Sequence, residues 1–346
     1  MHRRLHDGLT PVCTPSSRSS AAGVVGAGCR WSVLASGDVT EDLVLPVPQT
    51  LAAQYAVPLA APLAQPQARL DRVLEGLADP LDELVDGLLA TDRLVVAEHT
   101  AELLPPMTDD LLVLLGADAG QAARLRAATH WVLVEGHGRP GSAGHLWGAA
   151  AVAAGFAEQL GAPVLDLAGS DALTPGRLRQ GLPGPDGRVR LVDWVQILSS
   201  PGAGGLWFTT KGLRRFGLPE LQTECVPASF GHAWGSVLNG VASVLARRWW
   251  SLLDDPGHEP AFVTLPAGLD VRGSDVARAH GHRTAPDVPA DPAGRVGLRL
   301  DPEPDLRADS FLTVVPPPDH QGSATAFLAQ VCGLVLGPAQ RGGHVA

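Results

Sequence analysis

The sequence predicts an α+β fold, in which a mostly antiparallel sheet carries helices mainly on one face and follows a helical N-terminal lead-in. Strand patterns follow one another between residues 191 and 226, without the regular strand-helix alternation that is typical of a parallel sheet. A strand, a Gly/Pro turn and a helix recur at 131–160, 206–253 and 311–336. Helices that pack on a sheet select these same ingredients.

The composition excludes two classes of partner. The net charge of −10 at pH 7 repels phosphate backbones, so we expect no nucleic-acid partner. No run of about 18 apolar residues is present, so we expect no membrane span and a cytoplasmic protein. The four cysteines lie far apart without a CxxC pair, which excludes a zinc ribbon.

Residues 1–65 are expected to form a disordered or low-complexity N-terminal segment. They are rich in Ser, Pro, Gly and Ala without a sustained period, and the prolines from Pro46 to Pro66 oppose regular structure. We therefore expect a chain truncated near Ala68 to fold.

Residues 66–128 are expected to form a helical lead-in. Apolar residues recur at intervals of three and four from Leu70 to Leu88, which predicts a helix. Thr108 and Asp118 are typical N-cap residues and predict the start of two further helices.

Residues 129–337 are expected to form the α+β domain, with a tail at 338–346. The predicted strands are 131–135, 163–167, 191–198, 206–210, 218–226, 261–265, 296–300 and 311–315, and the predicted helices are 143–160, 229–252 and 324–336. Residues 266–293 are rich in Pro, Gly, Asp and His, so we expect a mobile loop there.

The long helix predicted after Ser229 is amphipathic. One face is apolar, and the opposite face carries a row of polar side chains: His232, Ser236, Asn239, Ser243 and Arg247. This polar face adds to the candidate binding surface.

The segment 207–221, WFTTKGLRRFGLPEL, holds Lys211, the only lysine of the chain. A strand leaves the sheet at Thr210, Gly212 allows a restricted backbone, and Leu213 and Phe216 are expected to anchor the excursion to the core. Arg214 and Arg215 are expected to point outward, and exposed arginines beside a tryptophan are typical of recognition surfaces.

These features favour a non-enzymatic binding or interaction module that uses the 207–221 loop together with the 136–145 loop. The expected partner is a protein or a small ligand, with no cofactor and no metal ion. The residues expected to bind it are Trp207, Thr210, Lys211, Gly212, Arg214, Arg215 and Glu220.

Residues 210–221 resemble the T-x-G-L-x-x-F-G-x-P-E-L signature of bacterial domains of unknown function. The similarity extends from about 108 to 337 and is specific only over 207–221. The resemblance implies an α+β domain without an established activity. It therefore argues against a dinucleotide-binding site, and it supplies no catalytic residues.

One alternative is a hydrolytic enzyme. Lys211, Glu220 and His232 follow one another closely enough along the chain to meet near a strand end. Against this alternative, the chain has no G-x-S-x-G elbow, and the threonines beside Lys211 are ordinary strand residues.

A second alternative is a nucleotide-cofactor protein. Gly136, Gly138 and Gly141 follow a predicted strand, precede a helix and lie upstream of Asp166, which is the context of a dinucleotide-binding loop. Glu135 and Pro140 oppose this interpretation, because a phosphate would meet negative charge and a stiffened turn.

A metal site at the same loop would draw on Glu135, His137 and His145. Imidazole and carboxylate groups are suitable ligands. The spacing of these three residues matches no recognised metal-binding motif, and we expect none.

Overall fold

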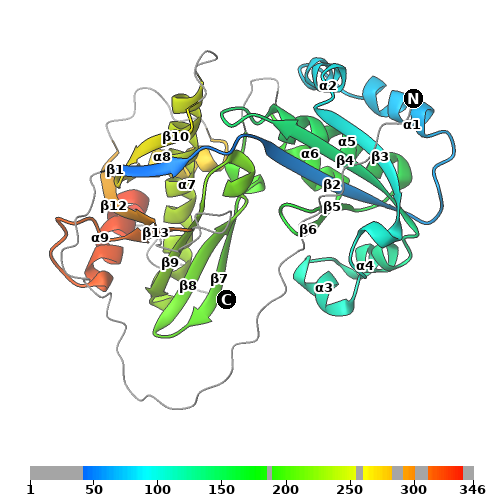
Figure 1. Cartoon of the computed structure of the whole chain (residues 1–346). Coiled ribbons are helices and arrows are strands. Elements are labelled where there is room, and N and C mark those ends of the chain that lie inside the picture. Colours follow the sequence, from blue (N-terminus) through cyan, green and yellow to red (C-terminus); the bar gives the residue numbers. More distant parts are fainter. Residues whose placement is uncertain (1–41, 185–188, 255–259, 283–290, 301–310, 338–346) are drawn as a thin grey trace.

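Two sheets with their own helices divide the chain into two lobes (Figure 1). The computed structural model describes residues 42–184, 189–254, 260–282, 291–300 and 311–337. The first lobe comprises residues 51–182, and the second lobe comprises residues 42–46 together with the described residues from 191 onward. The α+β class with antiparallel-rich sheets, predicted from the sequence, is confirmed.

The first lobe is built on a five-stranded antiparallel sheet with the order β3-β4-β2-β5-β6. Its strands are β2 (Leu51–Leu59), β3 (Leu94–Thr100), β4 (His130–Gly138), β5 (Val164–Asp166) and β6 (Asp171–Leu173). Its helices are α1 (Pro66–Glu75), α2 (Leu81–Ala90), η1 (Ala101–Leu103), α3 (Asp109–Leu114), α4 (Ala119–Arg126), α5 (Gly144–Leu160) and α6 (Pro175–Gly181).

Helix α5 packs on one face of this sheet, and α3 and α4 pack on the other. Thirteen of the 17 residues of α5 are buried, and most of them are Ala or Gly, so the helix can lie close to the strands. On the other face, Ala56, Trp131 and Leu165 of the sheet form a separate cluster with α3 and α4. Thr108 and Asp118 cap these two helices, as predicted.

The second lobe is built on a six-stranded sheet with the order β11-β12-β13-β9-β8-β7, in which only the β13–β9 pair is parallel. Its strands are β7 (Gln196–Gly202), β8 (Gly205–Lys211), β9 (Glu220–Val226), β11 (Gly268–Arg272), β12 (Ala293–Leu300) and β13 (Phe311–Val315). A further antiparallel pair joins β1 (Asp42–Pro46) to β10 (Phe262–Pro266).

The helices of the second lobe are η2 (Leu191–Asp193), η3 (Leu213–Phe216), η4 (Ala228–Phe230), α7 (Gly231–Leu253), α8 (Gly273–Ala279) and α9 (Ala324–Leu336). The apolar face of α7 buries Trp234 and Trp249 completely, and α7 packs against both α8 and α9. None of the helices in the described part of the chain is both long and apolar enough to cross a membrane.

The structure corrects the prediction for residues 1–65 over its last third. Residues 42–46 and 51–59 are strands, and β2 is the central strand of the first sheet. Pro58 is tolerated because β2 pairs with β5 only at Tyr55 and Ala56, so Pro58 lies where β2 has a neighbour on one side only. The remainder of the prediction, residues 1–41, lies outside the described residues.

Three further predictions need correction. The lead-in at 66–128 contains the strand β3 as well as helices, and β3 and β2 both pair with β4, so residue 129 is not a domain boundary. The loop predicted at 266–293 contains β11 and α8, because pairing with β12 stabilises a strand too short to be recognised from its pattern. The strand predicted at 191–198 begins only at Gln196, after η2. Residues 283–290 and the tail at 338–346 lie outside the description.

Because β2 is central, we predict that a truncation starting at Ala68 eliminates the cooperative thermal transition. The truncation removes β1 and β2 and leaves β4 and β5 without their shared neighbour. A truncation starting at Asp42, which keeps every described strand, is the control. Circular dichroism melts compare the two, and an unchanged transition in the shorter chain would contradict the prediction.

Candidate functional site

The 207–221 loop is closed by a single carboxylate. Glu220 is buried at the start of β9, and its two oxygens accept hydrogen bonds from the Thr210 hydroxyl at 2.6 Å and from the backbone N–H groups of Gly212, Leu213 and Arg214 at 2.8 to 3.2 Å. The last three donors belong to the start of η3. The carboxylate therefore satisfies the donors of this turn and fixes the path of the loop.

The apolar anchors of the loop lie where the sequence predicts. Leu213 and Phe216 are buried, and the Phe216 ring meets Trp250 of α7 edge to face at 5.4 Å. Gly212 has φ of 124°, and a Cβ at this position would lie 2.1 Å from the Trp194 carbonyl oxygen, so only glycine fits. The loop is packed between other elements of the protein.

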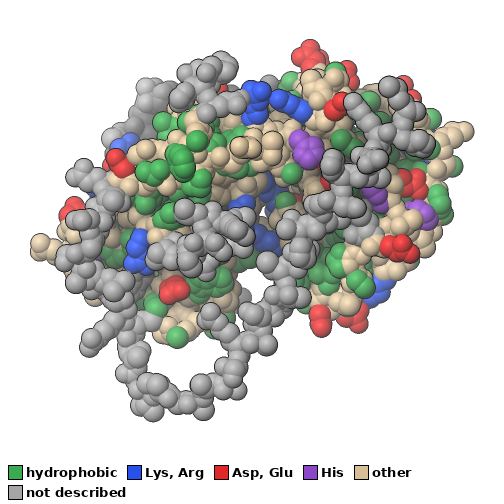
Figure 2. All heavy atoms as spheres, in the orientation of Figure 1, with side chains coloured by type: hydrophobic (Ala, Val, Ile, Leu, Met, Phe, Trp, Pro, Cys, Tyr) green, Lys and Arg blue, Asp and Glu red, His purple; other side chains and the backbone are tan. Residues whose placement is uncertain are grey.

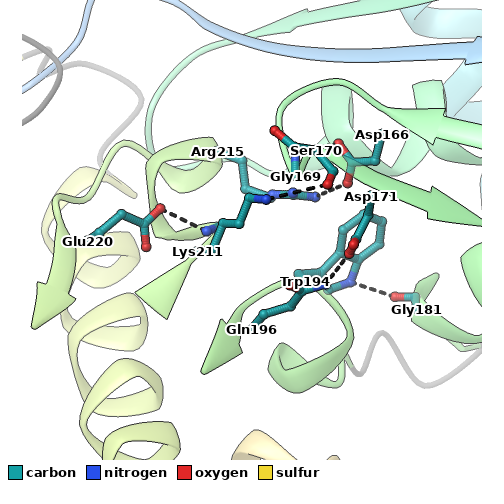
Figure 3. A network of polar contacts seen from close by, with 11 residues as sticks. Asp166, Gly169, Ser170, Asp171, Gly181, Trp194, Gln196, Lys211, Arg215 and Glu220 are labelled. Carbon is teal, nitrogen blue, oxygen red and sulfur yellow. Dashed lines mark hydrogen bonds and ion pairs between the residues drawn. The ribbon is translucent and has the colours of Figure 1, made fainter. Parts of the chain in front are cut away.

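The prediction that Arg215 points outward is wrong. Its side chain is 4% exposed and donates to the Asp166 Oδ2 atom at 3.0 Å, across the junction between the two lobes (Figure 3). The other oxygen of Asp166 accepts from the Gly169 N–H at 2.8 Å, and the Arg215 guanidinium lies 5.8 Å from the Trp194 ring centroid. Arg215 is buried because a carboxylate of the first lobe compensates its charge.

Two further polar contacts join the lobes beside this ion pair. The Lys211 ammonium donates to the Ser170 carbonyl at 3.4 Å, and the Gln196 amide donates to the Asp171 carboxylate. Burial raises the pKa of Asp171, and the nearby Lys211 charge opposes that shift. Lys and Arg side chains gather where the lobes meet (Figure 2).

The hydrolytic cluster is not assembled. Glu220 begins β9, whereas His232 lies near the start of α7, beyond the other end of the same strand. A strand of this length separates the two residues by about 20 Å. Lys211 contacts Ser170 instead, so the three side chains do not converge on one reacting centre.

The remaining predicted binding residues are engaged within the protein. Trp207 is half-buried and donates from its indole to Gln222 at 3.4 Å, and the Arg214 guanidinium lies 5.8 Å from the Phe311 ring centroid. Thr210 and Gly212 are buried. The loop is thus a structural connection between the lobes and offers little free surface.

The glycine loop has a packing explanation. A Cβ on Gly136 would lie 2.3 Å from the His145 carbonyl oxygen, and one on Gly138 would lie 2.1 Å from the His145 ring. Both glycines therefore allow α5 to pack closely on β4. Both neighbours of β4 are antiparallel, and Asp166 is paired with Arg215, so the parallel sheet and the free acid of a dinucleotide site are missing here.

His145 is a buried histidine at the start of α5. Burial lowers its pKa to about 4, the neighbouring His137 adds to this shift, and the Ser142 backbone opposes it. The imidazole is therefore neutral at pH 7. His137 lies 3.9 Å from a Glu135 oxygen, and no three His, Cys, Asp or Glu side chains in the described ranges converge as a metal ion would require.

A cavity of about 690 Å³ is lined by residues of both lobes. The first lobe contributes Ser142, which precedes α5, and Trp147 of α5, and α8 of the second lobe contributes Arg278. Trp250 also lines the cavity, so the aromatic ring that anchors Phe216 forms part of this wall. The 207–221 loop therefore contacts the cavity wall indirectly, through the packing of Phe216 on Trp250.

Helix α7 supplies the longest wall of the cavity. Arg247, Trp250, Ser251 and Asp254 line it from positions i, i+3, i+4 and i+7, which places them on one face of the helix. Ser243 and Arg247 belong to the polar face predicted for this helix and also line the cavity, whereas His232 of the same face lies exposed at the opposite end of the helix. Extending the same period by two turns would have reached Asp254.

Comparisons of this chain with protein-family models, with curated proteins and with solved structures find no match. The similarity of residues 210–221 to the bacterial signature therefore stays a prediction. The site is defined by its geometry alone.

We predict that Arg215→Met lowers the free energy of unfolding by about 3–5 kcal/mol, because it leaves the buried Asp166 carboxylate without its partner. The neighbouring substitution Arg214→Met is the matched control and should cost less than about 1 kcal/mol, since that side chain is only half-buried. Urea denaturation measures both.

The double variant Arg215→Met/Asp166→Asn should be more stable than the sum of the two single losses implies, because the pair is removed together. Equal losses for Arg214→Met and Arg215→Met would contradict this assignment of the buried ion pair.

We predict that the free energy of unfolding increases with pH because His145 is buried in its neutral form. Its pKa is about 4 in the folded chain against 6.5 in the reference state, so the unfolded chain binds more protons between these values. The stabilisation is complete above pH 6.5 and falls by about 3 kcal/mol as the pH drops to 4. Urea denaturation at several pH values measures this effect. Between pH 4 and pH 6.5 the free energy of unfolding of His145→Phe should increase by about 3 kcal/mol less than that of the wild-type chain. An identical rise in both proteins would contradict it.

Proposed function

We propose that this protein is a non-enzymatic binding protein that holds a small organic ligand in the cavity between its lobes. The cavity carries the proposal. Its volume of about 690 Å³ lies in the range of small-molecule sites, and it combines two tryptophans with a few polar and charged side chains. Such sites are common at the boundary between structural units.

The binding role predicted from the sequence is kept, but its location moves from the 207–221 loop to the cavity. The polar groups of the loop satisfy one another, with Glu220 bonded to four donors and Arg215 bonded to Asp166. Buried groups that are already paired have no capacity for a ligand. The loop contributes indirectly, because Phe216 packs on Trp250.

The hydrolytic and nucleotide-cofactor alternatives have weaker support. Lys211, Glu220 and His232 lie at different places, and Gly136 and Gly138 pack against His145. Recognition of a ligand requires only a shaped, partly apolar space with a few oriented polar groups, and the cavity supplies these features.

The fluorescent probe 8-anilinonaphthalene-1-sulfonate tests the proposal, since it combines aromatic rings with an anionic group. We predict saturable binding to the wild-type chain, and a loss of affinity of about tenfold or more in Ser251→Trp, which fills the cavity from an exposed position on α7. Leu252→Trp is the matched control, because Leu252 is 47% exposed, lies next in the sequence and does not line the cavity.

The control variant should bind the probe within about twofold of wild type. If wild type fails to bind the probe, or if the two tryptophan variants lose affinity equally, the cavity is not the binding site.

A further inference from the structure

A second cavity, of about 400 Å³, lies within the first lobe. The end of β2 and the segment that follows it form one side, and single residues of α1, α4 and the end of α5 complete it. Because β2 begins next to the second lobe and ends at the far side of the first, we name this space the outer cavity (Figure 1). The described residues that line it are all Ala, Leu or Pro except two, Arg69 and Arg124.

The two arginines reach the outer cavity from different helices. Arg69, in the first turn of α1, donates from Nε to the Ala64 carbonyl at 3.4 Å, and Arg124, near the end of α4, donates from Nη1 to the Gly161 carbonyl. Neither forms an ion pair with a carboxylate of the described residues. A guanidinium has five N–H donors in a planar fork that matches carboxylate and phosphate oxygens, so both side chains keep donors for an oxyanion.

The acidic side chains nearest to the outer cavity along the chain are engaged elsewhere. Glu158 pairs with Arg179 of α6. Both oxygens of Glu98 lie 3.2 Å from the Leu63 nitrogen and accept its N–H. Neither carboxylate lines the cavity. The two guanidiniums are therefore the charged groups that the described wall presents to a ligand.

The helix ends at the outer cavity leave this preference in place. The start of α1 has no acidic residue in its first turn and no side-chain cap from Gln65, so it lacks the negative charge that a helix N-terminus favours. The C-terminal ends of α4 and α5 also lie at the cavity, and each contributes about half a negative charge. Two full guanidinium charges exceed these partial charges, so the space favours an anion.

We infer that the outer cavity binds a small organic oxyanion, in which a carboxylate or phosphate group is carried by a compact apolar body. The oxyanion binds at Arg69 and Arg124. The apolar body lies against Leu59, Leu63 and Leu160. A volume of about 400 Å³ is in the range of small-ligand sites. This second site is independent of the proposed function, because the two cavities share no lining residue.

Four probes test the inference by isothermal titration calorimetry. Phenyl phosphate and benzoate carry an oxyanion on an aromatic ring, inorganic phosphate carries only the anion, and benzyl alcohol carries only the ring. We expect one of the two aromatic anions to bind about tenfold or more tightly than both inorganic phosphate and benzyl alcohol, since a charge-assisted contact and ring burial then add. The tighter of the two identifies the anionic group.

Substitutions assign this binding to the outer cavity. Arg69→Met and Arg124→Met should each weaken binding of the tighter aromatic anion about tenfold and leave benzyl alcohol within about twofold. Arg72→Met on α1 and Arg126→Met on α4 are the matched controls, because both arginines are exposed and line neither cavity. Both controls should bind the anion within about twofold of wild type.

Ser251→Trp, which fills the cavity that both lobes line, should bind the aromatic anion as wild type does. A loss of affinity in Ser251→Trp would place the anion in that other cavity and overturn the inference. Equal affinities for all four probes, or losses in Arg69→Met no larger than in Arg72→Met, would also overturn it. Arg69→Met decides alone if Arg124→Met, which also loses its contact with Gly161, does not fold. The proposed function is tested separately by the fluorescent probe.

Discussion

The ion pair between Arg215 and Asp166 is the contact on which the arrangement of the two lobes depends. Both side chains are almost fully buried, at 4% and 6% exposure, and unpaired charges at such positions would be strongly destabilising. The pair is favourable only if both partners are held in place. Glu220 shapes the turn that presents Arg215, and the Gly169 N–H holds Asp166. Two local hydrogen-bonded turns therefore set the relation between the lobes and, with it, the shape of the cavity.

The path of the chain makes this contact more important. The strand β1 pairs within the second lobe, and the next strand, β2, is central to the first. The chain returns to the second lobe after α6. The first lobe is therefore one continuous segment inserted into the second, and the second lobe is built from two separate segments of the chain. A change at the ion pair would act on both sheets, because each lobe contributes one of the two charges.

The sequence predicts the long and strongly patterned elements well. The small-residue helix α5, the amphipathic helix α7 and the caps at Thr108 and Asp118 follow from local chemistry, and the structure contains all of them. The strand β2 is not predicted because Pro58 within it and the prolines on either side of it oppose a strand locally, while its pairing with β4 is a long-range effect. Arg214 and Arg215 are indistinguishable in sequence. Only a carboxylate 49 residues away decides which of them is buried.

The candidate site shows the same division between local and long-range information. The 207–221 segment stands out in the sequence because its backbone is tightly constrained, and Gly212, Phe216 and Glu220 each meet one of those constraints. A loop with a constrained backbone can support a binding site without contributing side chains to it. Here the loop places Phe216 behind Trp250, whereas the side chains free to meet a ligand belong to an ordinary helical period on α7. That period becomes a site only because α5 of one lobe and α8 of the other close the space in front of it.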